Sequence, residues 1–234
     1  MSSPDTRKPK FDASAPRHGA ALHEVSLWPS DGQNYFARGR VRWLRRCLEE
    51  LGERPATVLD FGCGAGSTTP YFFEELEVRS LVGVEVSREL LAAAERTRAH
   101  AQVTYVQLGD YRAAESIDLA YSNSVFHRIP PRERMAAAVL VYRSLKSGGL
   151  FAFWENNPWS PGSLLGMLDG AGGRGPATLA APAARRLLRG VGFDIVHTTS
   201  AFYFPRALAW CRPIEPMLAS IPLGEQYMVL ARKP

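Results

Sequence analysis

Short apolar runs alternate with stretches of helical periodicity along most of the chain. Runs rich in Val, Leu, Ile and Phe predict buried strands at residues 57–61, 80–85, 103–108, 117–122, 150–155, 194–202 and 226–231. Apolar residues three or four positions apart predict helices at 31–51, 68–76, 88–98, 132–145, 182–189 and within 205–218. This alternation predicts an α/β fold, in which right-handed crossovers build a mostly parallel sheet with helices on both faces.

The two ends of the chain differ from this pattern. Residues 1–30 are rich in Ser, Pro, Arg and His without a clear period, so we expect a loosely attached lead-in before one domain at 31–234. The last two predicted strands lack a long, clean helical connection. An antiparallel last strand at or near the sheet edge is therefore expected. Ser87 is a candidate N-cap for the helix that follows it.

Composition narrows the class of protein. Hydrophobic residues make up 46% of the 234 residues and charged residues 22%, which is typical of a globular domain and excludes a disordered chain or a coiled-coil rod. Apolar runs stay well short of the roughly 18 residues of a membrane-spanning helix. No apolar stretch follows the N-terminal residues, so a cytoplasmic protein without a signal peptide is expected.

Cysteines and charge exclude further classes. The three cysteines are widely spaced and form no Cys-x-x-Cys pair, so neither a disulfide framework nor a metal site is expected. The net charge of +5 lies on the two flanks rather than in a clustered basic stripe with aromatic residues. This distribution disfavours a nucleic-acid partner.

The most informative stretch is the glycine-rich loop after the first predicted strand. Gly62, Gly64 and Gly66 alternate with other residues directly after Asp60. Glycine permits a tight turn and lets a ligand lie against the backbone. The third glycine falls one position too early for the Gly-x-Gly-x-x-Gly fingerprint of dinucleotide-binding proteins, which disfavours an oxidoreductase. A carboxylate at Asp60 suits an ammonium group and opposes a diphosphate.

A second carboxylate ends the next predicted strand. Glu85 follows Gly66 by 19 residues, and open parallel sheets bind ligands beyond the carboxyl ends of their strands. A carboxylate there can accept both hydroxyl groups of a ribose, and each such bond contributes about 1.5–3 kcal/mol. The pattern favours a nucleoside with a zwitterionic tail.

At this point the sequence resembles the class I S-adenosylmethionine-dependent methyltransferases, over about residues 35–234. The resemblance rests on five features in the order and spacing of that family: residues 59–66, residues 82–87, Gly109-Asp110, residues 117–123 and residues 146–149 before the fifth strand. It implies a doubly wound, seven-stranded, Rossmann-like methyltransferase fold and S-adenosylmethionine as cofactor.

The resemblance also implies roles for particular residues. The loop of Asp60, Gly62, Cys63, Gly64 and Gly66 would hold the methionine portion and ribose. Further cofactor contacts would come from residues near the ends of the next strands: Glu85 at the ribose hydroxyls, Val86 beside the adenine, Asp110 at its amino group, Tyr111 as a stacking or backbone contact, and Ser122 and Asn123 near the sulfonium. The alternative for Ser122 is that it only ends a strand, and the alternative for Tyr111 is that it is only a core residue.

The leading helix offers two further candidates. Tyr35 and Arg38 lie one turn apart on it, and such a helix often covers the cofactor in this family. Arg38 is therefore a candidate partner for the methionine carboxylate, with a solvated surface arginine as the alternative.

Two segments beyond the fourth and fifth strands are candidates for the acceptor side. His127 is a candidate general base because its unperturbed pKa lies near 6.5; the alternative is that it packs a hinge or touches the cofactor. Glu155 and Asn156 are candidate catalytic residues that, with Asn157, could orient an acceptor hydroxyl or amine at the start of the predicted acceptor-side loop (155–180); the alternative is a rigid turn at the sheet edge. The insertion at 203–225 would form a roof over the acceptor.

These inferences predict methyl transfer from S-adenosylmethionine to an oxygen or nitrogen atom of a small molecule. The missing prolines after Asn123 argue against exocyclic amines of adenine as acceptors. The alternatives are an RNA or protein methyltransferase and a module that binds S-adenosylmethionine without catalysis. The sequence leaves the acceptor and the oligomeric state open.

Overall fold

A computed structural model of the chain describes residues 32–168 and 179–234. Its strands are β1 (Thr57–Phe61), β2 (Ser80–Glu85), β3 (Val103–Gln107), β4 (Ile117–Asn123), β5 (Leu145–Asn156), β6 (Asp194–Ala201) and β7 (Gln226–Arg232). Its helices are α1 (Gln33–Leu51), α2 (Thr69–Leu76), α3 (Arg88–Thr97), α4 (Arg134–Ser144), α5 (Pro161–Leu168), α6 (Ala181–Val191), the 3-10 segment η1 (Arg206–Ile214) and α7 (Glu215–Leu218).

Within the described residues, the strands form one seven-stranded sheet in the order β3-β2-β1-β4-β5-β7-β6. Neighbouring strands from β3 to β5 are parallel, whereas β7 runs antiparallel between β5 and β6. This confirms the predicted α/β sheet with an antiparallel last strand. The last strand, β7, lies one place inside the edge of the sheet, because β6 pairs with its other side and forms that edge.

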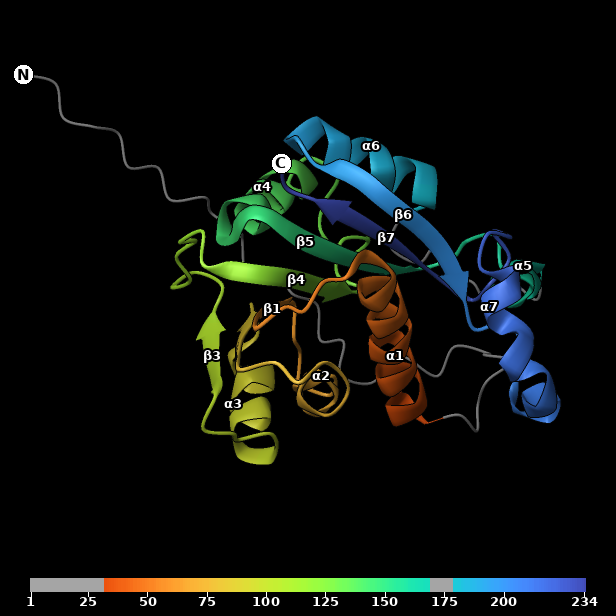
Figure 1. Cartoon of the computed structure of the whole chain (residues 1–234), viewed down its shortest axis with the longest axis horizontal. Coiled ribbons are helices and arrows are strands. Elements are labelled where there is room, and N and C mark those ends of the chain that lie inside the picture. Colours follow the sequence, from red (N-terminus) through yellow and green to blue (C-terminus); the bar gives the residue numbers. More distant parts are fainter. Residues whose placement is uncertain (1–31, 169–178) are drawn as a thin grey trace, which may run out of the picture.

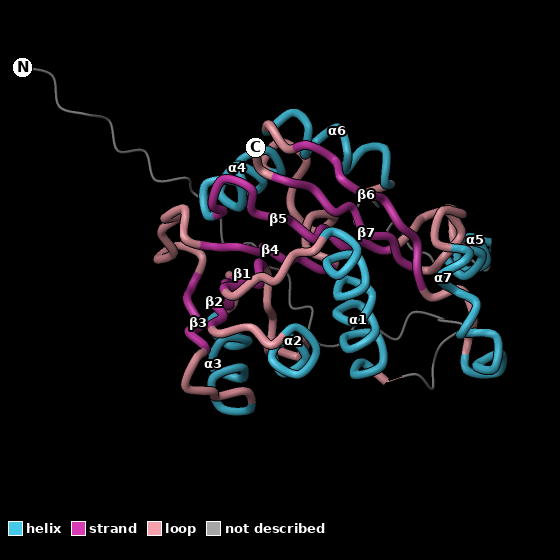
Figure 2. The backbone as a smooth tube through the Cα atoms, in the orientation of Figure 1, coloured by secondary structure: helices cyan, strands magenta, loops and turns pink. Residues whose placement is uncertain are grey.

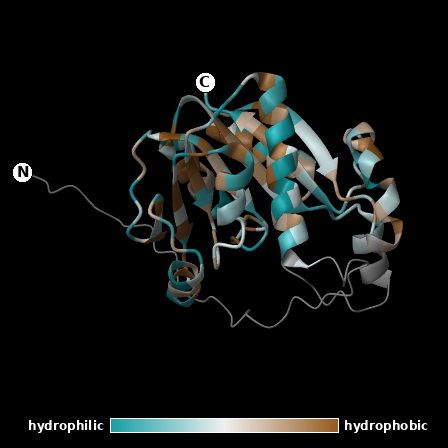
Figure 3. Ribbon diagram, turned by 60° about the horizontal axis from the view of Figure 1, so that its bottom comes forward, coloured by the Kyte–Doolittle hydropathy of each residue, from teal (hydrophilic) through white to brown (hydrophobic). Residues whose placement is uncertain are grey.

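Helices cover both faces of the sheet (Figure 1). Figure 1 shows α1, α2 and α3 on one side and α4 and α6 on the other. Each face has its own apolar cluster, one containing Val41 and Trp154 beneath α1 and the other containing Val141 and Phe151 beneath α4. In the hydropathy colouring of Figure 3, the strands are mostly brown, while α1 carries both teal and brown segments. The apolar strands and amphipathic α1 are what a doubly covered sheet requires.

Local signals place several boundaries correctly. On α1, Val41, Leu44 and Leu48 are buried at helical spacing, and Gly52 ends the helix with φ 69°. The side chain of Ser87 accepts a hydrogen bond from the Leu90 amide, so its prediction as the N-cap of α3 is confirmed.

The fifth strand is longer than its apolar run predicts. It begins at Leu145 rather than at residue 150, because Leu145 pairs with Ile117 of β4 across a register shift before Leu150 pairs with Leu119. The preceding helix α4 is accordingly shorter than predicted, at Arg134–Ser144. Backbone pairing across a polar turn leaves no apolar pattern that a sequence reading can detect.

The C-terminal insertion is helical, as predicted (Figure 2), and it is divided between η1 and α7. Pro213 lies inside η1, and the 3-10 segment gives way to α7 just after it. The amide of Ser200 on β6 donates to the Ala219 carbonyl at 2.8 Å, which fixes the insertion beside the end of β6.

Some predictions fall outside the described residues. The predicted lead-in at 1–30 and residues 169–178 of the acceptor-side loop are among them. In the part of the chain that the structure covers, no helix is both long enough and apolar enough to cross a bilayer.

Candidate cofactor and acceptor site

The glycine loop between β1 and α2 has the conformation that only glycine adopts without strain. Gly62, Gly64 and Gly66 have φ values of 79°, 55° and 72°. A Cβ atom at Gly62 would lie 2.3 Å from a methyl group of Val125, and one at Gly66 would lie 2.7 Å from the hydroxyl of Tyr105. A Cβ at Gly64 would meet nothing within 4 Å, so the loop opens onto free space at its centre.

Glu85 at the end of β2 lies against this loop, as the sequence predicts. Its Oε2 atom accepts the amide of Gly64 at 3.1 Å. Its Oε1 atom accepts the amides of Val86 and Ser87 at 2.7 and 3.1 Å. A carboxylate has about four acceptor positions, so these three bonds orient the group and leave acceptor capacity on Oε2.

A buried polar network lies behind the loop. Asp60 is 3% exposed and Arg40 is 6% exposed. The Arg40 guanidinium donates to the Tyr121 hydroxyl at 3.0 Å and to Oε1 of Gln226 at 3.1 Å. Burial, together with the charge of Glu85, raises the pKa of Asp60 to about 7, while Arg40 acts in the opposite direction.

Arg40 is the residue of this network that the sequence analysis missed. It lies one turn after Ala37 and one residue before Val41, on the apolar face of α1. A charged residue at an apolar position of an amphipathic helix is a signal that could have identified it. Arg38, the predicted partner of the methionine carboxylate, instead pairs with α2: its guanidinium lies 2.6 Å from Glu75 and 3.6 Å from Glu74.

The other candidate cofactor residues lie along the same end of the sheet. Val86 is 51% exposed and Asp110 is exposed, so both side chains are accessible to a ligand. Cys63 is buried within the loop. The hydroxyl of Tyr111 donates to Ser144 on α4 at 2.9 Å, which attaches the loop after β3 to that helix. This contact favours the core role for Tyr111 over stacking.

Strand β4 ends in a strained segment. The Oγ atom of Ser122 is fully buried without a hydrogen-bond partner, and Asn123 precedes Ser124, whose φ of 55° is unusual for a residue other than glycine. The amide of Ser124 donates to the Trp154 carbonyl of β5 at 3.0 Å. Strain of this kind persists only where the surroundings hold it, and it is concentrated at functional sites.

His127 and Glu155 form a close pair on the loop after β4. Nδ1 of His127 lies 2.6 Å from Oε2 of Glu155, whose side chain is 1% exposed. Oε1 of Glu155 also accepts the amides of Phe126 and His127 at 2.8 and 3.2 Å. Glu155 therefore fixes both the backbone of this loop and the imidazole ring of His127. When Nδ1–H of His127 donates to the Glu155 carboxylate, the neutral imidazole presents Nε2 as a hydrogen-bond acceptor.

The two asparagines after Glu155 have structural partners. Asn156 is exposed and accepts a hydrogen bond from Gln226 at 3.0 Å. Asn157 is buried and donates to the carbonyls of Pro222 and Gly224 at 3.0 and 2.8 Å. Asn157 thus ties the acceptor-side loop to the insertion, which corresponds to the rigid-turn alternative for this residue.

Aromatic side chains join α1 to the insertion. The Phe202 ring packs against Phe36 and Tyr35, with centroids 5.0 and 6.0 Å apart. The Arg212 guanidinium lies 4.3 Å from the centre of the Tyr35 ring. Tyr35 therefore contacts Phe202, just before the insertion, through its ring edge, and Arg212 of the insertion through a cation–π contact.

The geometry fits S-adenosylmethionine at the glycine loop. Open space at Gly64 provides room beside bare backbone, and Glu85 presents spare acceptor capacity to a ribose. Asp60 provides a carboxylate behind the loop for a cationic group. The fold and this arrangement are similar to those of the class I S-adenosylmethionine-dependent methyltransferases, whose cofactor is S-adenosylmethionine.

Comparisons with known proteins agree. The profile of the family described as "Methyltransferase domain" matches residues 59–151. A trans-aconitate 2-methyltransferase of Azoarcus sp. is 31% identical over 125 residues, which are 52% of this chain and 49% of that protein. A malonyl-[acyl-carrier protein] O-methyltransferase of Halalkalibacterium halodurans is 28% identical, over 55% of this chain and 51% of that protein. The chain thus spans about half the length of the curated relatives it matches.

The fold is also similar to that of solved structures. An S-adenosylmethionine-dependent methyltransferase from Mesorhizobium loti superimposes with a TM-score of 0.60 at 20% identity, covering 84% of this chain and all of that one. At this identity the similarity concerns the fold.

Proposed function

We propose that the chain transfers the methyl group of S-adenosylmethionine to an oxygen or nitrogen atom of a small-molecule acceptor. The observation that carries the proposal is the open glycine loop with Glu85 hydrogen-bonded to Gly64. A relative whose name specifies trans-aconitate, a small organic acid, supports a small acceptor, and one whose name specifies O-methylation supports transfer to oxygen. In this proposal the protein is cytoplasmic.

The chain's residues divide between binding and positioning. Residues Asp60 to Gly66 hold the amino-acid end and ribose, Glu85 accepts a ribose hydroxyl at Oε2, and Val86 and Asp110 contact the adenine. Asn123 lies nearest the reacting end. The bound cofactor supplies an electrophilic methyl group on a cationic sulfur.

His127 receives the proton of a hydroxyl or amine acceptor. Its Nδ1–H donates to Glu155, so Nε2 carries the lone pair that accepts the proton. Glu155 is a positioning residue, because its carboxylate fixes the imidazole and the backbone of its loop. Proximity and orientation provide most of the acceleration in such a direct displacement.

Calorimetric titration with S-adenosylhomocysteine tests the cofactor site. Gly64→Val fills the open space and Glu85→Ala removes the ribose acceptor, so we expect each to weaken binding at least about tenfold. Gly52→Val is the matched control: Gly52 also has a left-handed φ of 69° and open space, but it lies at the end of α1. Unchanged affinity in both site variants would refute the assignment.

A further inference from the structure

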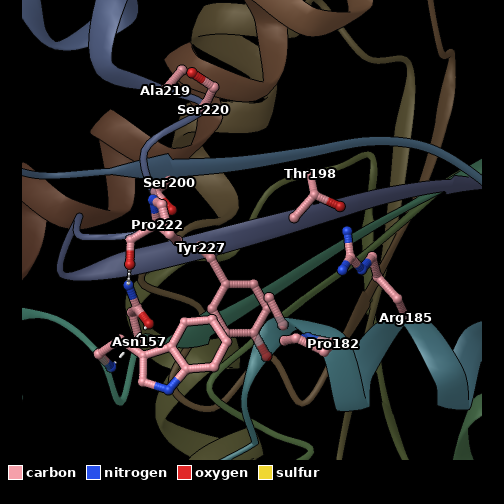
Figure 4. Close-up of a pocket in the computed structure, with 11 residues that line it drawn as sticks. Asn157, Pro182, Arg185, Thr198, Ser200, Ala219, Ser220, Pro222 and Tyr227 are labelled. Carbon is pink, nitrogen blue, oxygen red and sulfur yellow. Dashed lines mark hydrogen bonds between the residues drawn. The ribbon is translucent and has the colours of Figure 1, made fainter.

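A separate cavity of about 260 Å³ lies between α6, the end of β6 and the segment that precedes β7 (Figure 4). The loop after β5 also lines it, through Asn157 and Trp159. Its volume is slightly below the range of about 300–1,000 Å³ typical of drug-sized ligands. The cavity therefore suits a small metabolite.

Arg185 of α6 is the one charged side chain among the described residues that line this cavity. Figure 4 shows its guanidinium extending from α6 toward Thr198 on β6. Its Nε atom is buried and has no hydrogen-bond partner among the described residues. A buried donor without an acceptor is costly, and Arg185 is a cation, so an anionic group in the cavity would provide the missing partner.

Two further features favour an anion. The first turn of α6 lines the cavity through Ala181 and Pro182, and the positive end of a helix dipole attracts negative charge. The hydroxyl-bearing residues Thr198 and Ser220 line the same space, and hydroxyl groups can donate to a carboxylate.

The remaining walls are apolar or aromatic. Trp159, Pro222 and Tyr227 line the cavity. The Tyr227 hydroxyl donates to the Leu179 carbonyl, so its ring forms a wall while its polar atom is already satisfied. An apolar ligand body would gain from contact with these rings.

The cavity adjoins the proposed acceptor side. Tyr227 of β7 is the register partner of Glu155 of β5, the residue that holds His127. Asn157 lines the cavity two residues further along the same strand and loop. A ligand in the cavity is therefore next to the strand end at which methyl transfer is proposed.

The geometry points to a binding site for a monocarboxylic acid with an apolar, preferably aromatic, body, whose carboxylate pairs with Arg185. This inference rests on the proposed function, because it takes the occupant to be the methyl acceptor: a hydroxyl or amine on its body would bond the methyl carbon as the carbon–sulfur bond breaks, with S-adenosylhomocysteine as the leaving group and His127 taking the proton. One guanidinium pairs with one carboxylate, and the aromatic walls fit an apolar body. They do not match the three carboxylates of trans-aconitate, so acceptor choice differs from that of the trans-aconitate methyltransferase named above.

Phenylacetate, phenylacetamide and trans-aconitate are the probes, titrated by calorimetry into the full chain loaded with S-adenosylhomocysteine. Phenylacetate is expected to bind, and its neutral amide and trans-aconitate to bind at least about tenfold more weakly. Arg185→Gln should weaken phenylacetate binding at least about tenfold, and Arg185→Lys should restore part of it. Arg186→Gln, at an exposed position on the same helix, is the matched control for loss of one charge.

Each outcome decides a point. The inference is overturned if phenylacetate does not bind, or if it binds Arg185→Gln as tightly as the native chain. In either case, retained binding of S-adenosylhomocysteine leaves the proposed function standing. Tighter binding of trans-aconitate than of phenylacetate overturns the monocarboxylate class. Failure to bind S-adenosylhomocysteine refutes the proposed function, and the acceptor assignment falls with it. Retained S-adenosylhomocysteine affinity in Arg185→Gln shows that this variant is folded.

Discussion

The carboxylate of Glu155 holds His127 twice, through the ring Nδ1 at 2.6 Å and through the backbone amide at 3.2 Å. Glu155→Gln keeps the size of the side chain but offers one acceptor oxygen in place of two. We therefore expect the variant to lose about 1–3 kcal/mol of stability, because a buried donor is left unpaired. Urea unfolding measures this loss.

The same variant tests whether Glu155 positions the imidazole. In the native chain the neutral ring of His127 should be the Nδ1–H tautomer, whereas Glu155→Gln should give a mixture. Nitrogen chemical shifts of the ring, assigned with His127→Gln, distinguish the two. A tautomer that is unchanged by Glu155→Gln would leave Glu155 with a role in stability alone.

Gly62 and Val125 bring the glycine loop and the loop after β4 into contact. A Cβ at Gly62 would lie 2.3 Å from Cγ2 of Val125, and the φ of 79° adds backbone strain. Gly62→Ala should therefore lower the thermal unfolding midpoint and weaken S-adenosylhomocysteine binding, with a cost of about 1–3 kcal/mol from the backbone alone.

The double variant Gly62→Ala/Val125→Ala separates the two causes. It removes the steric overlap but keeps the strained φ, so it should recover part of the lost stability and not all of it. Recovery to the native midpoint would show that the backbone conformation costs nothing. No recovery would show that the contact with Val125 is not responsible.

The two arginines of α1 should differ sharply on substitution. Arg40→Gln removes a buried guanidinium that donates to Tyr121 and Gln226, so we expect a loss of about 2–4 kcal/mol and weaker cofactor binding. Arg38→Gln removes a half-exposed ion pair with Glu75, which Arg42 and Arg45 also contact. Such exposed pairs are screened by solvent, so Arg38→Gln should change stability little.

Urea unfolding and S-adenosylhomocysteine titration of both variants decide between the arginines. A tenfold loss of affinity in Arg38→Gln, with stability retained, would restore Arg38 as the partner of the methionine carboxylate. If only Arg40→Gln loses stability and S-adenosylhomocysteine affinity, the buried network of Arg40, and not Arg38, holds the glycine loop in place.

The elements most accessible to sequence reading are the central strands. The bounds of β1 and β2 match the prediction because a buried parallel strand is a continuous apolar run bounded by polar residues. The glycine loop and Glu85 were also predictable, since they follow directly from chain order in an open parallel sheet.

Features that depend on tertiary contacts were not predictable. The partners of Arg38, the attachment of Tyr111 to α4 and the bonds from Asn157 to residues 222 and 224 join positions far apart in sequence. The cavity around Arg185 needs α6, β6 and β7 in place before it exists. In each case the residue type was visible, but its partner was set by the packing of other elements.

Asp60 should make stability depend on pH. Its pKa is raised in the folded chain from an ordinary 3.8 to about 7, first by burial and then by the charge of Glu85. Between these values the unfolded chain releases the proton while the folded chain keeps it. The contribution of Asp60 to stability therefore falls as pH rises from about 4 to 7 and is constant above that range.

Asp60→Asn removes this titration, and urea unfolding of both chains at pH 5 and pH 8 measures it. Between pH 5 and pH 8, the free energy of unfolding of the native chain should fall by about 1–3 kcal/mol more than that of the variant, since one pKa unit corresponds to about 1.36 kcal/mol. If Asp60 also faces the ammonium end of the cofactor, S-adenosylhomocysteine binding at pH 6 should release a proton, which titration in buffers of different ionisation enthalpy detects. Parallel stability curves for the two chains would mean that Asp60 is ionised throughout, with Arg40 compensating its burial fully.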